Sequence, residues 1–344
     1  MSSELRAGIA GFGLAGRVFH APLIAATEGL SIARILTTDP ERRATAESLY
    51  PDAVIVGSLE ELWDDIDVLV VATTNDAHVA LASETLDRGL AAVVDKPLAI
   101  DAAGAEELVA RGGRLTVYQN RRWDGDFRTV QTAAQSGELG PLIRFESRFD
   151  RFVPVVRGER WRERDDPALG GGLLLDIGSH LVDQARVIGG PVRRVYAELD
   201  VRRPGAVVED DVYLSLEHAG GLRSQLWAST AAPLHGPRFR LTGLEAGIET
   251  HGLDPQWQQL AEGMVPGDPG YGLAPPAQLA DAGGRIELAM APGAYQDFYA
   301  EVVAWLRDDG PVPVDPADSL AGLRVLDAAR EAARSGTVVD VAGG

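Results

Sequence analysis

The sequence has no cysteine, which excludes disulfides, thiolate nucleophiles and zinc sites built on cysteine. It also has no apolar run of membrane-spanning length, since the best one, residues 67–72, is the size of a strand. The first residues show no basic segment followed by an apolar one, so we expect no signal peptide. These absences predict a cytoplasmic protein.

Basic residues are in the minority, with 32 of them against 51 acidic residues and a formal net charge of −19 at pH 7. Nucleic acids and anionic membranes bind basic surfaces, so we expect no nucleic acid and no membrane as a partner. An anionic cofactor remains compatible with this charge, because a phosphate site is local.

Lysine occurs once, as Lys96, and every other basic residue is arginine. Arginine stays protonated at all relevant pH values, whereas lysine can shift its pKa and exchange a proton. Lys96 is therefore the first residue to explain. The alternative is an ordinary surface lysine, which the neighbouring residues described below make less favourable.

The chain has 344 residues with ordinary globular composition, which fits two domains. Its first third alternates apolar runs with helical patterns, as βαβ units and a parallel sheet do. The expected strands are 6–10, 30–36, 53–56, 67–72, 91–94 and 114–118, and helices include 76–88 and 101–111. This α/β pattern predicts an N-terminal Rossmann domain, a doubly wound parallel sheet, over residues 1–120.

After residue 120 the strands follow one another in hairpin order. The expected strands are 142–151, 192–201, 210–218, 222–229 and 238–242, and the expected helices are 124–136, 176–188, 295–308 and 317–335. Residues 252–284 are rich in Gly, Pro and Gln and are expected to be loop. We therefore predict a C-terminal α+β domain over residues 121–344, with a large, mostly antiparallel open sheet.

Residues 11–16 form a G-x-G-x-x-G motif, which is weak alone because the chain has 39 glycines. Here it follows the first strand and opens a helix, as a dinucleotide site requires. Gly11 permits the tight turn, Gly13 lets the pyrophosphate approach, and Gly16 allows the helix to pack on the strand. The expected phosphate-binding turn comprises Gly11, Phe12, Gly13, Leu14 and Gly16.

The second strand ends in Thr37 and Thr38, where an NAD enzyme usually has an acidic residue for the ribose hydroxyls. Arg42 and Arg43 follow, close to where a 2′-phosphate would lie. Hydroxyls and arginines together favour NADP over NAD. The alternative is that both arginines are solvated and that Asp39 binds the ribose.

Two further motifs carry chemistry. Asp95-Lys96-Pro97 ends the fifth strand, at the sheet edge that faces the ligand crevice, where Lys96 would bond a substrate oxygen and help relay its proton. Asp176 and His180 are four residues apart at the start of a helix and so share one face. His180 would accept a proton near neutral pH. The alternatives for this pair are a buried structural histidine, an exposed helix pair, or half of a metal site that lacks a third ligand.

The motifs together are similar to the Gfo/Idh/MocA oxidoreductases, the family of glucose–fructose oxidoreductase and inositol dehydrogenase. The resemblance runs from Gly8 to about Leu306 and rests on residues 11–16, 19–23, 72–78 and 95–97 and on the pair Asp176 and His180. Residues 119–123 and 160–163 further resemble the branch that contains NADP-dependent scyllo-inositol dehydrogenase. Asp95 stands where the family usually has Glu, and Thr74 where Pro is common.

This resemblance implies a catalytic group of Lys96, Asp176 and His180 and no metal. It also implies oligomerisation through the open face of the second sheet, which we expect to give a homodimer or homotetramer. The resemblance also implies cofactor contacts from Thr73, Asn75 and His78. We further expect the cofactor site to include Thr74, Asp95, Lys96 and Pro97.

The predicted function is hydride transfer between nicotinamide and a ring carbon of a polyol or sugar, with scyllo-inositol and its ketone as first candidates. The expected substrate-binding residues are Asn120, Arg122, Trp161, Asp176 and His180, although Arg121 or Arg122 could instead hold a carboxylate. The alternatives are a reductase of a sugar-nucleotide ketone or another carbonyl, and a non-catalytic cofactor-binding sensor, which would be expected to lack Lys96 or His180.

Overall fold

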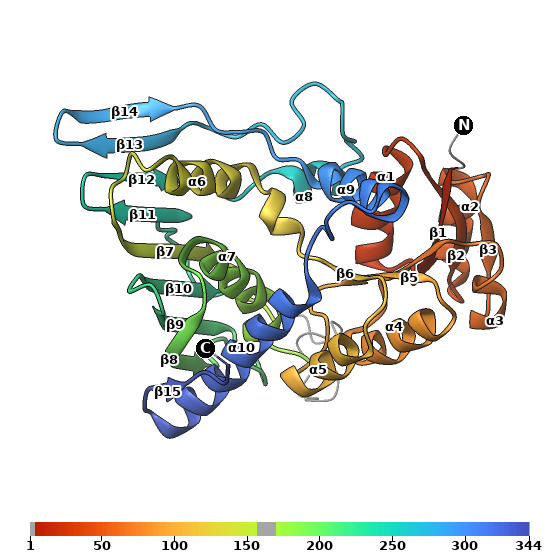
Figure 1. The fold of residues 1–344 in the computed structure, drawn as a ribbon, viewed down its shortest axis with the longest axis horizontal. Helices are drawn as coiled ribbons and strands as arrows, with labels where there is room; N and C mark the ends of the chain where they lie inside the picture. Colours follow the sequence, from red (N-terminus) through yellow and green to blue (C-terminus); the bar gives the residue numbers. More distant parts are fainter. Residues whose placement is uncertain (1–3, 157–169, 344) are drawn as a thin grey trace.

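The computed structural model describes residues 4–156 and 170–343, which form two sheets side by side (Figure 1). The first sheet has six parallel strands in the order β3-β2-β1-β4-β5-β6. They are β1 (Leu5–Ala10), β2 (Leu30–Leu36), β3 (Val54–Val56), β4 (Val68–Val71), β5 (Ala91–Asp95) and β6 (Leu115–Tyr118). This order confirms the predicted doubly wound Rossmann sheet.

Helices cover both faces of the first sheet, and its inner strands are therefore apolar without alternation: all four residues of β4 are buried. The helical segments are η1 (Ala15–His20), α1 (Ala21–Ala25), α2 (Pro40–Leu49), α3 (Leu59–Leu62), η2 (Asn75–Ala77), α4 (His78–Asp87) and α5 (Ala102–Arg111). Their starts follow local chemistry, since Asp101 caps α5 by accepting a hydrogen bond from the Gly104 amide.

The second sheet has nine strands in the order β14-β13-β12-β11-β7-β10-β9-β8-β15. They are β7 (Leu142–Asp150), β8 (Val192–Asp200), β9 (Asp211–His218), β10 (Arg223–Ser229), β11 (Phe239–Gly243), β12 (Ala246–Thr250), β13 (Ala277–Asp281), β14 (Gly284–Leu288) and β15 (Val339–Asp340). Only β7 and β10 pair in parallel. The predicted, mostly antiparallel sheet is confirmed.

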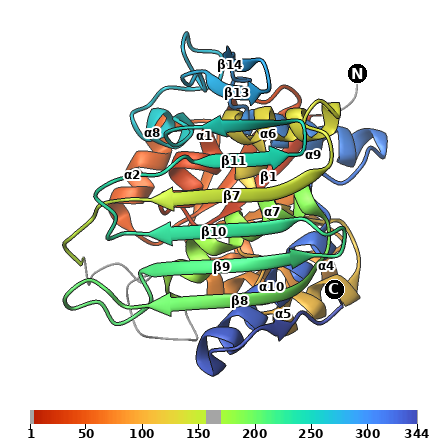
Figure 2. The same ribbon diagram turned by 90° about the vertical axis from the view of Figure 1, so that its left-hand side faces the viewer.

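One face of the second sheet carries helices and the other is bare, as Figure 2 shows with the bare face toward the viewer. The helical segments of this half are η3 (Asn120–Trp123), α6 (Gly125–Ser136), η6 (Leu174–Gly178), α7 (Ser179–Gly189), α8 (Gln256–Ala261), α9 (Tyr295–Asp308) and α10 (Pro316–Ser335). Helices α6 and α7 pack on β11 and β7, and α10 packs on β8. Along β9, buried Val212, Leu214 and Leu216 alternate with half-buried residues, as expected for a sheet covered on one side.

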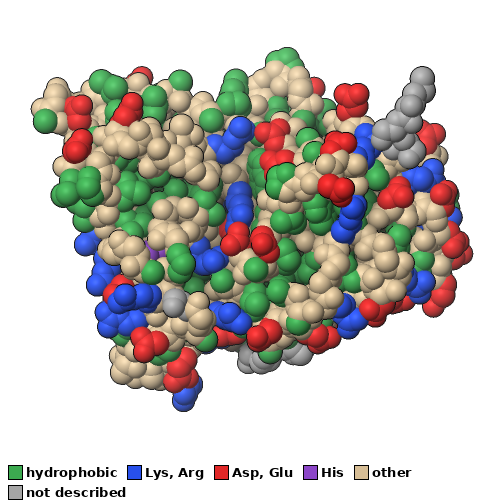
Figure 3. Space-filling view, in the orientation of Figure 1, with side chains coloured by type: hydrophobic (Ala, Val, Ile, Leu, Met, Phe, Trp, Pro, Cys, Tyr) green, Lys and Arg blue, Asp and Glu red, His purple; other side chains and the backbone are tan. Residues whose placement is uncertain are grey.

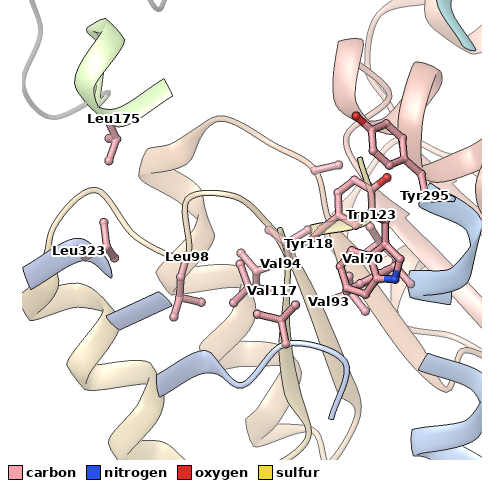
Figure 4. Close-up of a cluster of buried hydrophobic side chains, with 14 of the residues drawn as sticks. Val70, Val93, Val94, Leu98, Val117, Tyr118, Trp123, Leu175, Tyr295 and Leu323 are labelled. Carbon is pink, nitrogen blue, oxygen red and sulfur yellow. The ribbon is translucent and has the colours of Figure 1, made fainter. Parts of the chain in front are cut away.

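The last two long helices join the two sheets. Helix α9 packs against α1 and η3, and α10 lies between α5 and α7 (Figure 1). The carboxylate of Asp327 in α10 accepts a hydrogen bond from the first amide of α5, at 2.9 Å. Figure 4 shows the shared core, in which Val93 and Val94 of β5 lie in one cluster with Leu175 and Leu323 from the second half. The two halves are therefore packed as one body around these helices.

Part of the secondary structure differs from the sequence prediction. The expected loop 252–284 is wrong, because it contains α8 and β13. Helix α8 starts where the Asp254 carboxylate accepts a hydrogen bond from the Gln256 amide, at 2.9 Å. Strand β13 forms because its partners extend the sheet: Leu279 pairs with Ile248 on one side and Ile286 on the other. Such pairing is set by the sheet and not by local composition.

On the face shown in Figure 3, acidic and basic side chains lie intermingled over most of the molecule. Among the described residues, no helix combines the length and apolar character that crossing a membrane requires.

Candidate active site

The glycine-rich turn after β1 has the shape that a dinucleotide needs. Gly11 has a φ of +99°, and a Cβ atom there would lie 2.7 Å from the Ala72 carbonyl oxygen. A Cβ on Gly16 would overlap the carbonyl oxygen of Gly11. Gly13 is open, because the only heavy atom near a Cβ there is Nη1 of Arg42, at 3.8 Å. Two glycines thus make the turn, and the third leaves room for a pyrophosphate.

Exposure within this turn differs from residue to residue. Leu14 is exposed, whereas Phe12 is buried and packs edge-on against Tyr50, with ring centroids 6.2 Å apart. Leu14 is therefore the side chain of this motif that a cofactor could contact, while Phe12 supports the turn from inside the core.

Some residues after β2 bind other parts of the protein, and others are exposed to solvent. The Asp39 carboxylate caps α2, accepting hydrogen bonds from the amides of Glu41 and Arg42 at 3.0 Å each. Arg43 donates to the Ile55 carbonyl at 2.9 Å. Thr37 is buried and Thr38 is exposed. Arg42 is thus the arginine that lies over the glycine-rich turn, while Arg43 faces β3.

The residues after β4 hold the neighbouring turn in place. Thr73 and the exposed Thr74 lead into Asn75, whose amide donates to the Gly170 carbonyl at 3.3 Å. His78 is buried, and its Nδ1 lies 2.7 Å from the Pro97 carbonyl oxygen. A carbonyl oxygen can only accept, so Nδ1 carries the proton. His78 therefore fixes the turn that contains Lys96.

Asp95 ends β5 inside a buried polar group. Its Oδ1 accepts the Lys96 amide at 2.9 Å and lies 3.7 Å from His20 Nε2. His20 in turn shares a 2.5 Å hydrogen bond with the Tyr299 hydroxyl. Burial raises the pKa of the Asp95 carboxyl, but the contacts and charges of His20 and Lys96 outweigh burial and hold the pKa below its ordinary value. Asp95 is therefore a carboxylate at the crevice edge.

Lys96 and Asp176 meet across the junction of the two sheets. Lys96 Nζ donates to the Asp176 carbonyl oxygen at 2.7 Å and to its Oδ1 at 2.9 Å. The side chains are 13% and 30% exposed, so the pair is reachable from solvent on the side of Asp176. The lysine comes from the turn after β5 and the aspartate from η6.

His180 lies at the start of α7 and is 3% exposed. Burial, reinforced by the positive charges of Lys96, Arg121 and Arg238, holds the pKa of His180 well below its ordinary value of 6.5. Its Nδ1 is buried without a hydrogen-bond partner in the described part of the chain. Titration of His180 near neutral pH therefore stays a prediction from the sequence, while burial and the three nearby cations favour the neutral imidazole.

Comparison with known proteins assigns both halves of the chain. A model of the oxidoreductase family with an NAD-binding Rossmann fold matches residues 5–117, and the GFO/IDH/MocA C-terminal domain matches residues 127–249. The uncharacterized oxidoreductase YdgJ of Escherichia coli is 35% identical over 97% of this chain and 98% of its own. The chain belongs to the Gfo/Idh/MocA oxidoreductase family.

Two further relatives of this Gfo/Idh/MocA protein are informative. The NADP-dependent scyllo-inositol 2-dehydrogenase IolW of Bacillus subtilis is 29% identical, over 96% of this chain and 94% of its own. The crystal structure of a putative oxidoreductase from Klebsiella pneumoniae is 30% identical and superposes with a TM-score of 0.90, covering 100% of this chain and 96% of that one. The family and the NAD(P)-binding oxidoreductase fold are thus shown.

Within this family fold, the predicted substrate-binding residues lie in different settings. Asn120 is buried at the start of η3. Arg122 binds Asp183 with two hydrogen bonds, at 2.9 and 2.7 Å, and Asp318 with a third, at 3.0 Å. Trp161 lies outside the described residues. The structure therefore gathers Lys96, Asp176 and His180 but gives the Arg122 guanidinium two carboxylate partners of its own.

Sequence reasoning missed a buried polar layer behind His180. Arg238 is 2% exposed and donates to the Gln184 side chain at 3.0 Å, and Gln184 donates to the Arg121 carbonyl at 2.9 Å. Gln184 follows His180 by one helical turn, and its place on the buried side of an amphipathic helix was a usable signal. Nothing local in the sequence marks Arg238. Across the described ranges, no three His, Asp or Glu side chains gather as a metal site would need.

Proposed function

We propose that this protein is an NADP-preferring dehydrogenase that oxidises a ring carbon of a polyol or sugar. The observation that carries the proposal is the contact between Lys96 and Asp176 beside the neutral, buried His180, at the crevice edge of a Rossmann sheet. A bound nicotinamide would supply the acceptor or donor of the hydride. The glycine-rich turn, with Gly13 open and Arg42 over it, fits the phosphates of such a cofactor.

The chain's own residues would handle the hydroxyl of the substrate. Lys96 donates a hydrogen bond to the reacting oxygen and stabilises the negative charge that develops on it. His180, neutral at neutral pH, accepts the hydroxyl proton. Asp176 holds the ammonium group of Lys96 through its carboxylate and backbone carbonyl. This division of roles is supported by the contact of Lys96 with Asp176 and by the buried position of His180 at the start of α7.

We infer that the substrate is a neutral ring with several hydroxyls. Oxidation of one carbon requires that the neighbouring hydroxyls are gripped, so that one C–H faces the nicotinamide. Asp176 and Asn120 offer acceptors and a donor for this grip. The two arginines that could hold a carboxylate have partners within the chain: Arg121 with Asp124 at 3.1 Å, and Arg122 as described above. The relative IolW, named for scyllo-inositol and NADP, supports the same substrate class.

We also propose that the protein forms a homodimer or homotetramer through the bare face of the second sheet (Figure 2). Two aromatic rings and an arginine stack there: Tyr213 and Trp227 lie 5.3 Å apart, and the Arg148 guanidinium lies 3.7 Å from the Trp227 ring. Aromatic residues and arginine are enriched at protein interfaces. Trp227→Glu should therefore lower the mass measured by sedimentation equilibrium, and an unchanged mass would refute this interface.

The deciding experiment is a screen of inositols, pyranoses, hydroxy acids and keto acids with NADP and with NAD. Turnover is measured as the change in nicotinamide absorbance, in the direction of oxidation and in the direction of reduction. We expect turnover with inositols or sugars, scyllo-inositol and its ketone first, and a higher kcat/KM with NADP. Turnover confined to hydroxy or keto acids would overturn the substrate class. Cofactor binding without turnover on any substrate would instead indicate a sensor.

A further inference from the structure

Arg122 forms a bridge between the segment that leaves the Rossmann sheet and the helix that carries His180. It lies in η3, immediately after β6, and its guanidinium holds both carboxylate oxygens of Asp183 in α7. Both groups are shielded from solvent, with side chains 17% and 5% exposed. A two-point arginine–carboxylate contact fixes orientation as well as distance.

The next residue of α7 repeats this connection to η3. Gln184 is fully buried, donates to the Arg121 carbonyl and accepts from Arg238, the residue immediately before β11. Consecutive side chains of α7, Asp183 and Gln184, are thus bound to consecutive residues of η3. Helix α7 is therefore held to η3 by two neighbouring side chains, one turn after His180.

The same end of α7 faces the turn of Lys96. A small cavity of about 10 Å³ is lined by Pro97, by Ser179 and by Asp183, among other residues. Ser179 precedes His180, and Pro97 follows Lys96. The contact between Arg122 and Asp183 therefore lies next to the point where the turn that carries Lys96 approaches the start of α7, which carries His180.

We propose that Arg122 is a positioning residue that sets His180 at its distance from Lys96, and that it does not bind substrate. The role of His180 in the reaction is the proposed function above, so this inference rests on it. Asp183 is the partner through which Arg122 acts. Arg186, also on α7, donates to the Asp318 carbonyl at 2.7 Å and lies 3.8 Å from the Asp318 carboxylate, which Arg122 also binds. Among the described residues it forms no hydrogen bond or ion pair with η3, so its removal leaves the contact between Arg122 and Asp183 in place.

The first test reads the placement of His180 without substrate, by NMR titration of histidine labelled at Cε1, with the signal assigned by its loss in His180→Asn. Burial lowers the pKa of His180 most, and three cations lower it further: Lys96 from the turn after β5, Arg121 from η3 and Arg238 immediately before β11. If α7 moves away from Lys96 in Arg122→Met, burial and repulsion both weaken. The pKa of His180 should then rise toward its ordinary value.

Asp183→Asn distinguishes a change in the position of His180 from the electrostatic effect of removing the negative charge of Asp183. Removing a nearby negative charge alone would lower the pKa of His180, because the imidazolium loses a favourable neighbour. Loss of the contact between Arg122 and Asp183 predicts the opposite sign, a rise. Arg122→Lys keeps the charge without the two-point contact and should give an intermediate rise. These two variants keep the test decisive if Arg122→Met does not fold.

The second test is kinetic. Arg122→Met should lower kcat by about 10- to 100-fold, the usual effect of a misplacement of about 1 Å, while the Kd for NADP stays within about twofold. Arg186→Met, the matched control, should leave both kcat and the His180 titration nearly unchanged. Equal effects of the two variants, or an unmoved His180 titration in Arg122→Met, would overturn the inference. A wild-type enzyme inactive on all polyols and sugars would refute the proposed function and leave the titration result to decide the positioning role.

Discussion

Lys96 Nζ lies 2.9 Å from Oδ1 of Asp176, although the two residues are 80 positions apart and belong to different halves of the chain. The same nitrogen also binds the backbone carbonyl of Asp176. The only lysine of the protein is therefore held by two acceptors of one residue, which account for two of the three N–H groups of its ammonium. A surface lysine would have no such arrangement.

Lys96→Arg should lower kcat by about 100- to 1000-fold, the range for losing one hydrogen-bond donor to a developing oxyanion, with little change in fold or in the Kd for NADP. Arginine keeps the positive charge, but its planar fork does not fit a site in which a single nitrogen binds two acceptors of Asp176. The measurement is steady-state kinetics with cofactor binding by fluorescence. Arg88→Lys, an exchange at an exposed ion pair with Glu84, is the control. Near wild-type turnover of Lys96→Arg would remove the role assigned to Lys96.

His180→Ala should lower kcat for alcohol oxidation by about two to four orders of magnitude. In the wild type the neutral imidazole is the active form, so the rate should fall as the pH falls through the pKa of His180. That pKa is held well below 6.5, so the limb should lie at acidic pH and not near neutrality. The limb should vanish in His180→Ala and persist in the control variant of the exposed His251, His251→Ala. A wild-type limb centred at or above pH 6.5 would contradict the buried environment described here.

The features of this site that depend on local backbone conformation could be predicted from the sequence alone. A strand, a G-x-G-x-x-G turn and a helix place Gly11, Gly13 and Gly16 without knowledge of other parts of the chain, because the requirement on each glycine is local. Lys96 follows from its position after the fifth strand of a parallel sheet. The approach of Asp176 to Lys96 does not follow from any local pattern, and was expected only through the family resemblance.

The side-chain partners could not be predicted, because they depend on tertiary packing. Arg42 and Arg43 are adjacent and chemically identical, yet one lies over the glycine-rich turn and the other binds β3. The two carboxylate partners of Arg122 are 61 and 196 positions away in the sequence, so no local pattern could predict them. Strand β13 was missed for the same reason, since its hydrogen-bond partners decide its conformation.

Asp126 should make the stability of the protein depend on pH. It is buried, and burial raises its pKa to about 8 despite the Arg238 Nε at 3.8 Å. The folded protein then binds a proton that the unfolded chain, with an ordinary carboxyl pKa, releases between about pH 4 and 8. The stability supplied by this group is therefore full at low pH and declines as the pH rises toward 8.

Asp126→Asn replaces this protonated carboxyl by a neutral group of the same shape. We expect the variant to fold and to show a smaller decline in unfolding free energy between about pH 5 and 8, measured by urea denaturation at several pH values. Asp281→Asn, at an exposed strand end, is the control. An equally steep decline in Asp126→Asn would show that the carboxylate is charged in the folded state.

Cofactor preference should depend on Arg42 more than on Arg43. Arg42 is the cation nearest the open Gly13. Asp39, the residue that could bind the ribose hydroxyls of NAD, caps α2 with Oδ1, and its Oδ2 lies 3.9 Å from Nε of Arg42. Arg43 is held by Ile55 and by Glu47, the latter at 3.0 Å. A 2′-phosphate would therefore meet Arg42 first, together with the hydroxyl of the exposed Thr38.

Replacing both arginines by alanine should raise the KM for NADP much more than that for NAD. Most of this change should come from Arg42→Ala alone, about 10- to 100-fold, since a hydrogen bond to a charged group contributes about 1.5–3 kcal/mol and 1.4 kcal/mol is a factor of ten. Arg43→Ala is the matched control, one residue away with the same change of charge, and should alter the KM for NADP by less than about threefold. Initial rates at varied NADP and NAD would measure both. A wild-type enzyme that prefers NAD would refute the assignment directly. Equal effects of Arg42→Ala and Arg43→Ala on the KM for NADP would contradict the prediction. The preference for NADP would then depend on the positive charge of both arginines and not on a direct contact of Arg42 with the 2′-phosphate.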